Sequence, residues 1–195
     1  MLFPPPMPAR TELRQATAAV HGRLHHVPVF AALAAGRLDL DGYLDLLGRL
    51  HGLHEPFEAA VARAGPPGLQ PGQWRRAHML RSDMAALGRS EAAIGALPWH
   101  PAPSGHWSPA QAMGCLYVIE GSTLGGRQLA RQLDHLLPTA DAAGRTFLLA
   151  GTGEDHVRWR DFCAALDACG ADPVSRADMV AGAVEAFRCF EAWFA

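Results

Sequence analysis

Apolar residues recur at spacings of three and four along most of this chain, a pattern typical of amphipathic helices. Alanine and leucine dominate these stretches, while β-branched residues are sparse and nowhere alternate as a strand would. The pattern predicts helices over residues 11–26, 40–64, 74–87, 108–137, 141–149, 154–168 and from 172 to near the end. We therefore expect an all-α fold, with residues 11–195 as one multihelical domain and residues 1–10 as a disordered lead.

Capping residues and prolines set several boundaries of this pattern. Asp39 or Asp41 lies near the start of the long helix expected over residues 40–64. Pro56 falls inside that helix and should kink it, because proline lacks a backbone N–H. Residues 97–107 are rich in proline and are expected to be irregular.

The helix expected over residues 108–137 is loaded with glycine near its centre. That centre reads Met113-Gly-Cys-Leu-Tyr-Val-Ile-Glu-Gly-Ser-Thr-Leu-Gly-Gly-Arg127. Each glycine inside a helix costs about 1 kcal/mol relative to alanine, so Gly121, Gly125 and Gly126 must serve a purpose. Gly121 and Gly125 are four residues apart and leave two bare patches of backbone on one face. Such glycines allow the close approach of a backbone or a ligand, or a bend in the helix, and a flat, bulky ligand could lie directly on this face.

Composition and charge exclude several classes of protein. The formal charge of −2 gives no global attraction to nucleic acid or to an anionic membrane, and no apolar run reaches the roughly 20 residues that span a bilayer. The first residues lack the basic and apolar regions of a secretory signal. The four cysteines form no Cys-x-x-Cys pair, so we expect reduced core residues in a cytoplasmic protein.

The helix expected over residues 11–26 carries a candidate ligand for iron. Its predicted apolar stripe consists of Leu13, Ala16, Val20 and Leu24. Arg14, Thr17 and His21 are spaced to share one face, where a neutral imidazole can ligate haem iron and an arginine can meet a propionate. His25, one turn further along, is a rival ligand. Taken alone, His21 is one of ten histidines and could simply pack or face solvent.

Two motifs together resemble the haem oxygenase family. They are Leu13-Arg-Gln-Ala-Thr17 followed by His21, and Leu116-Tyr-Val-Ile-Glu-Gly-Ser-Thr-Leu-Gly-Gly126. The sequence is most similar to the bacterial branch that supplies biliverdin to bacteriophytochromes. The similarity extends to Gly52-Leu-His-Glu-Pro-Phe-Glu58 and to the expected C-terminal helices, so it covers most of the chain.

The resemblance implies a role for each matching residue. His21 would be the proximal haem ligand, and the distal residues lying over the haem would be Gly121, Ser122, Gly125 and Gly126. The other expected haem contacts are Arg14, Thr17, Tyr117 and Arg160. Many family members have an aspartate at the position of Ser122, where it orders water. Serine can hold a water but brings no charge, which leaves the details of proton delivery open.

The activity that the resemblance implies is oxidative cleavage of haem to biliverdin, carbon monoxide and ferrous iron. Haem would be both cofactor and substrate, and oxygen and electrons would be consumed. The chain has no Gly-x-Gly-x-x-Gly segment, so the electrons should come from a separate ferredoxin or flavin reductase. Arg127 and Arg131 could receive an acidic redox partner or simply form a solvated face.

Other functions stay open from the sequence. The missing distal carboxylate allows a non-enzymatic haem carrier or sensor on the same fold. A thiamin-degrading helical enzyme would need a reactive cysteine, and all four cysteines lie in largely apolar stretches. His51, His54 and Glu55 loosely resemble zinc ligands, although packing is the better interpretation. The absence of any Glu-x-x-His motif argues against a ferritin-like di-iron protein.

Overall fold

The computed structural model describes residues 7–101, 106–138, 142–150 and 155–195, and these residues form helices and connecting turns without a strand. The helices are α1 (Ala9–Leu24), α2 (Pro28–Ala34), α3 (Leu40–Ala64), α4 (Ala77–Ala86), α5 (Glu91–Gly95), α6 (Pro109–Ser122), α7 (Gly126–Arg131), α8 (Thr146–Leu149), α9 (Asp155–Cys169) and α10 (Pro173–Phe194). Two 3₁₀ turns, η1 (Pro71–Gln73) and η2 (Thr123–Gly125), complete the described elements.

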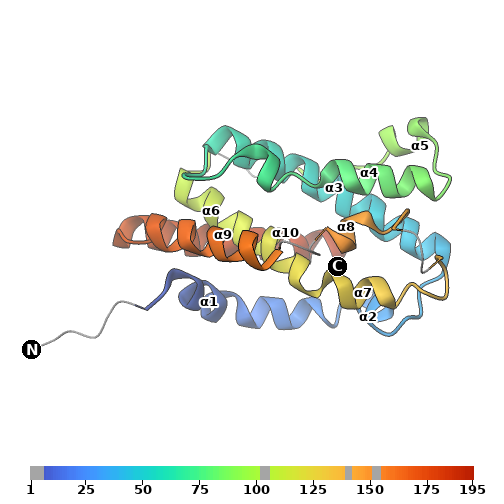
Figure 1. The fold of residues 1–195 in the computed structure, drawn as a ribbon, viewed down its shortest axis with the longest axis horizontal. Helices are drawn as coiled ribbons and strands as arrows, with labels where there is room; N and C mark the ends of the chain where they lie inside the picture. Colours follow the sequence, from blue (N-terminus) through green and yellow to red (C-terminus); the bar gives the residue numbers. More distant parts are fainter. Residues whose placement is uncertain (1–6, 102–105, 139–141, 151–154) are drawn as a thin grey trace, which may run out of the picture.

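The helices stack in layers across the molecule (Figure 1). In that view α3 and α4 lie along one side, α1 lies along the other, and α6, α9 and α10 run between them. Helix α10 packs along both α6 and α1, and α3 packs against α4 and α6. The layers enclose one continuous core of buried apolar side chains contributed by helices from both ends of the chain. No helix in the described ranges meets the length and hydropathy that a membrane span requires.

Helices α6 and α10 approach so closely that their backbones touch. A Cβ atom at Gly114 would overlap the carbonyl oxygen of Met179, and one at Gly182 would overlap the carbonyl oxygen of Gln111. Each helix therefore uses a glycine where it crosses the other. The contact fixes α6, the helix that ends at the glycine-rich segment, against the C-terminal helix.

Helix α3 has the bounds predicted for it, and Asp39 caps it by accepting a hydrogen bond from Gly42 N at 2.8 Å. Pro56 lies within the helix and leaves the carbonyl of Gly52 without its usual donor. His100 N donates to that carbonyl at 2.8 Å, so the irregular segment after α5 repairs the gap.

The structure corrects the predicted first helix. Helix α1 begins at Ala9 rather than at residue 11, so Ala9 and Arg10 do not belong to a disordered lead; residues 1–6 lie outside the described ranges. The cause is a carboxylate from α9, because Ala9 N donates to Asp167 Oδ1 at 2.8 Å. The predicted apolar stripe is wrong at Ala16, which is exposed, and Thr17 takes its place on the buried face.

Other predicted boundaries also change. The helix expected over residues 108–137 starts as predicted, with a capping box between Ser108 and Gln111, but α6 ends at Ser122. The chain then continues through η2 and α7. The helix expected over residues 141–149 is helical only over α8, and residues 139–141 lie outside the described ranges. Helices α2 and α5 were missed because each is at most seven residues long and too short to show periodicity.

Candidate functional site

His21 lies near the end of α1 with its side chain exposed at the surface. Its ring makes edge contacts with the ring of His25, at a centroid distance of 4.8 Å, and with Phe187 of α10, at 5.8 Å. Partial burial against these neighbours lowers the pKa of His21, and the charge of His25 lowers it further. Both effects favour the neutral imidazole, which is the form that binds a metal.

The end of α6 exposes bare backbone. Within the described part of the chain, a Cβ atom at Gly125 would meet no other atom within 4 Å, and one at Gly121 would meet only Trp159, at 3.9 Å. Leu124, between them, is 58% exposed although it is apolar. Ser122 is exposed as well, and its hydroxyl donates to the carbonyl of Ile119 at 2.6 Å. Among the described residues, the segment therefore offers an open, largely apolar surface that only the edge of Trp159 approaches.

Gly126 serves a different purpose from Gly121 and Gly125. It is buried, and a Cβ atom there would overlap the carbonyl oxygen of Leu148 in α8. Gly126 is therefore required for the packing of α7 against α8, whatever it does toward a ligand. The family resemblance gave all three glycines a place over the haem. The structure shows that Gly126 packs against α8, whereas Gly121 and Gly125 do not.

Helices α1 and α6 are in contact. On α6, burial raises the pKa of the Tyr117 phenol, and the positive charges of Arg14 and Arg10 on α1 partly offset that rise. Both helices run in the same general direction in Figure 1. His21 lies about 10 Å beyond Arg14, and Gly121 and Gly125 lie one and two turns beyond Tyr117. The histidine and the open glycines therefore extend to the same side of this contact.

Thr17 and Arg160, two other predicted haem contacts, have partners within the protein. Thr17 is buried on the packed face of α1, where its hydroxyl donates to the carbonyl of Leu13 at 2.8 Å. Arg160 is exposed and pairs with the neighbouring Asp161. Helix α9 instead presents Trp159, whose ring lies 6.3 Å from that of Tyr117. Arg14 therefore lies close enough to Tyr117 to lower the pKa of its phenol, and the predicted haem contacts of Thr17 and Arg160 stay predictions.

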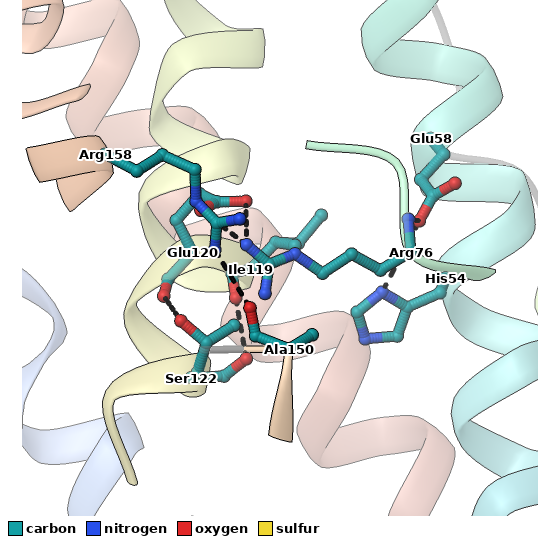
Figure 2. A network of polar contacts seen from close by, with 9 residues as sticks. His54, Glu58, Arg76, Ile119, Glu120, Ser122, Ala150 and Arg158 are labelled. Atoms are coloured by element: carbon teal, nitrogen blue, oxygen red, sulfur yellow. Dashed lines mark hydrogen bonds and ion pairs between the residues drawn. The ribbon is translucent and has the colours of Figure 1, made fainter. Parts of the chain in front are cut away.

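Glu120, the residue before Gly121, belongs to a buried network of charges (Figure 2). Arg76 Nη2 donates to both carboxylate oxygens of Glu120, at 3.0 and 2.8 Å. Arg158 of α9 approaches the same carboxylate, with Nε 3.7 Å from Oε2. Sequence reasoning missed this network. The available signal was Glu120 itself, the single charged residue of α6 in an otherwise apolar run.

Glu58 connects this network to α3. Its Oε1 accepts hydrogen bonds from the backbone N–H groups of Arg76, at 2.7 Å, and Ala77, at 2.9 Å, and so caps the start of α4. His54, one turn earlier, places Nδ1 3.9 Å from the same oxygen. Burial lowers the pKa of His54 to about 3, with a further contribution from the charge of Arg76, so the ring is neutral at physiological pH.

The rings of His51 and His54 pack against aromatic residues. His51 lies 5.1 Å from Trp99, and His54 makes edge contacts with Phe147 and Phe190. Within the ranges that the structure describes, no three metal-ligating side chains gather closely enough to hold a metal ion. The two rings thus make the aromatic packing contacts that the packing interpretation predicts.

Glu58 should make the stability of the protein depend on pH. Burial raises its pKa to about 7, against the opposing effect of the two backbone hydrogen bonds. The folded state then binds more protons than the unfolded state between pH 4.5 and 7, so the contribution of Glu58 to the free energy of unfolding falls by roughly 3 kcal/mol as the pH rises through that window. Denaturant unfolding of wild type and Glu58→Gln at pH 5, 6, 7 and 8 measures this difference, with Asp41→Asn, at an exposed carboxylate in the first turn of α3, as control. Parallel curves for wild type and Glu58→Gln would contradict it.

The four cysteines show no sign of a reactive thiol. Burial raises the pKa of Cys115, Cys163, Cys169 and Cys189, and all four are free. Nucleophilic cysteines need the opposite shift. This observation argues against the thiamin-degrading alternative.

Comparison with known proteins decides the family. The family model described as Heme oxygenase matches residues 7–195. The chain belongs to the haem oxygenase family. A heme oxygenase of Xanthomonas campestris pv. campestris (strain 8004) is 38% identical over 163 residues, which span 82% of this chain and 92% of that protein.

Solved structures of haem oxygenases share the fold. Heme oxygenase-1 from the cyanobacterium Synechocystis sp. PCC6803, in complex with heme, gives a TM-score of 0.73 at 17% identity and covers 96% of this chain and 91% of its own. The heme oxygenase of Leptospira interrogans gives a TM-score of 0.74 at 17% identity, and the match covers 96% of this chain and 98% of that protein. The predicted fold class and family are therefore confirmed.

The residues of this haem oxygenase fit haem. His21 offers a neutral imidazole, and Gly121 and Gly125 leave backbone uncovered on the same side of the contact between α1 and α6. Arg14 is exposed two turns before His21, where a guanidinium can meet a carboxylate. Haem, a flat and largely apolar ring with iron at its centre and carboxylates at one edge, would fit these three features, with His21 as the iron ligand.

Proposed function

We propose that this haem oxygenase cleaves haem to biliverdin, carbon monoxide and ferrous iron with oxygen and external electrons, and that it holds haem between His21 and the backbone of Gly121 and Gly125. The observation that carries the proposal is the pairing of an exposed, neutral imidazole with glycines whose Cβ positions meet nothing closer than 3.9 Å. When bound, haem supplies both the iron that activates oxygen and the ring that is cleaved.

Each residue has a separate task in this proposal. His21 ligates the iron, and a neutral imidazole donates less electron density than a thiolate, which avoids the oxygen–oxygen cleavage that cysteine-ligated haem favours. Gly121 and Gly125 keep the distal side open to a small molecule. Ser122, exposed beside them, can turn its hydroxyl from Ile119 to hold a water that delivers protons. Arg14 positions a propionate.

The remaining expectations stay predictions. They are contacts of Thr17 and Arg160 with haem, a role of Gly126 above the ring, and Tyr117 as a haem contact. Electrons come from a ferredoxin or flavin reductase, for which the exposed Arg127 and Arg131 of α7 offer a basic docking surface. Biliverdin is passed to a bacteriophytochrome in the cytoplasm.

The proposal predicts stoichiometric haem binding followed by ring opening. Purified protein titrated with hemin should saturate at one equivalent. Addition of ascorbate under oxygen should then bleach the Soret band and release biliverdin, which chromatography identifies. Catalase in the reaction controls for destruction of haem by free hydrogen peroxide.

The competing function is a haem carrier or sensor, favoured by the lack of a distal carboxylate at Ser122. It predicts a Soret band that survives repeated cycles of reduction and oxygenation, and haem that transfers intact to apomyoglobin. That result would overturn the enzymatic proposal.

A further inference from the structure

Residues 121–125, called here the open glycine segment, contribute almost no side-chain packing of their own. Gly121 and Gly125 have no side chain, Ser122 is exposed and Leu124 is 58% exposed. Something else must therefore determine the direction in which this backbone faces. The C-terminal end of the segment is held where Gly126 packs against Leu148 of α8. At its N-terminal end, the segment directly follows Glu120.

Glu120, which directly precedes Gly121, is the anchor at that end. Its carboxylate is among the least exposed charged groups of the protein, with Glu120 4% and Arg76 2% exposed. Arg76 stands at the start of α4, and Arg158 on α9 donates from Nη2 to the carbonyl of Ala150 at 3.4 Å while its Nε faces Glu120. One carboxylate thus joins the end of α6 to elements on two sides (Figure 2).

One short hydrogen bond links Glu120 to η2. Thr123 Oγ1 donates to the backbone carbonyl of Glu120 at 2.7 Å. Rotation or retreat of Glu120 would therefore turn η2 with it. A buried ion pair adds little net stability compared with apolar packing, but it is directional, and leaving one partner unpaired is costly.

We propose that Glu120 is a positioning residue: paired with Arg76 and Arg158, it sets the orientation of the Gly121–Gly125 backbone and thereby selects which edge of the haem ring is cleaved. This inference rests on the proposed function, because it names the regiochemistry of that same reaction. Glu120 touches neither haem nor oxygen in this scheme. It acts only through the backbone that follows it.

The decisive variant is the double replacement Arg76→Met with Glu120→Met. Apolar side chains of similar volume can replace a buried ion pair without loss of the fold, whereas removal of one partner strands a buried charge. Asp178→Asn is the matched control, because Asp178 accepts from Ser108 Oγ at 2.7 Å at the opposite end of α6. Arg158→Gln provides a milder variant, since that side chain is partly exposed and its loss leaves the pair of Arg76 and Glu120 in place.

The first readout is amide hydrogen exchange of the haem-free proteins. The double variant should keep a cooperative unfolding transition while the amides of residues 119–126 exchange about tenfold faster than in wild type. Arg158→Gln should change them in the same direction by less, and Asp178→Asn should leave them unchanged. Equal exchange of residues 119–126 in wild type and in both network variants would overturn the proposal.

The second readout is the biliverdin isomer. Wild type and Asp178→Asn should yield the same distribution, and the double variant should yield a measurably broader one. Faster exchange with an unchanged isomer distribution would also overturn the proposal, since it would show a purely structural role. If wild type opens no haem at all, the proposed function fails, and the exchange comparison still decides whether Glu120 positions the segment.

Discussion

Replacement of His21 by alanine is expected to abolish the histidine-ligated spectrum of bound haem and to lower biliverdin formation by at least about 100-fold. Loss of groups that merely orient a metal ligand costs 10–100-fold in affinity or activity, so loss of the ligand itself should cost no less. Because an apolar ring can enter the apolar site without an imidazole ligand, the spectrum is a sharper measurement than binding alone. Absorption and electron paramagnetic resonance spectra of hemin-loaded wild type and His21→Ala test this expectation.

His25→Ala is the control for this experiment. The two rings lie 4.8 Å apart on the same side of α1, so both variants disturb the same surface, and only one removes the proposed ligand. His25→Ala should keep the wild-type spectrum. A histidine-ligated spectrum in His21→Ala that disappears in His25→Ala would transfer the assignment to His25.

Substitutions at the two adjacent glycines are expected to have opposite effects on the haem-free protein. Gly126→Ala should lower the free energy of unfolding by about 1–3 kcal/mol, because the new Cβ would overlap the backbone of α8 at Leu148. Gly125→Ala should raise it by about 0.4–1 kcal/mol, because the backbone at Gly125 is already helical, at φ −88° and ψ −11°, and the Cβ enters open space. Denaturant unfolding of the haem-free variants measures both.

Gly125→Leu extends this comparison to function. The larger side chain should leave the haem-free protein as stable as wild type and should crowd the distal side, so that oxygen binding weakens or the cleaved position shifts. Stopped-flow oxygen binding and chromatography of the product provide the measurement. An unchanged rate and an unchanged isomer would show that Gly125 does not face the iron. Destabilisation by Gly125→Ala as large as that by Gly126→Ala would contradict the separation of the two glycines.

The local pattern of apolar and boundary residues was sufficient to predict the long helices and part of the site. Helix α3 has its predicted bounds, and α9 and α10 lie within two residues of theirs, because each combines a long apolar repeat with a proline, glycine or capping boundary. The family resemblance assigned His21 and the glycine segment to the site. It also assigned Thr17 and Arg160 to the site; in the structure Thr17 lies on the packed face of α1, and Arg160 forms a surface ion pair.

The buried network could not be predicted in the same way. Glu58, Arg76, Glu120 and Arg158 come from four separate parts of the chain, and no spacing in the sequence relates them. Only the packing of α3, α4, α6 and α9 brings them together. The start of α1 is a further example, since Asp167, on α9, receives the N–H of Ala9 and extends the helix beyond its predicted beginning.

By itself, the sequence determined that this is a helical haem oxygenase with an imidazole donor near its start and a glycine-rich segment past its middle. Those properties are local, because a helix, a cap or a glycine is encoded within a few neighbouring residues. The tertiary structure decided which glycines face open space, which one packs against α8, and which carboxylate stands behind them. These are relations between surfaces of different helices, and they exist only once burial of the shared core has fixed how the helices pack.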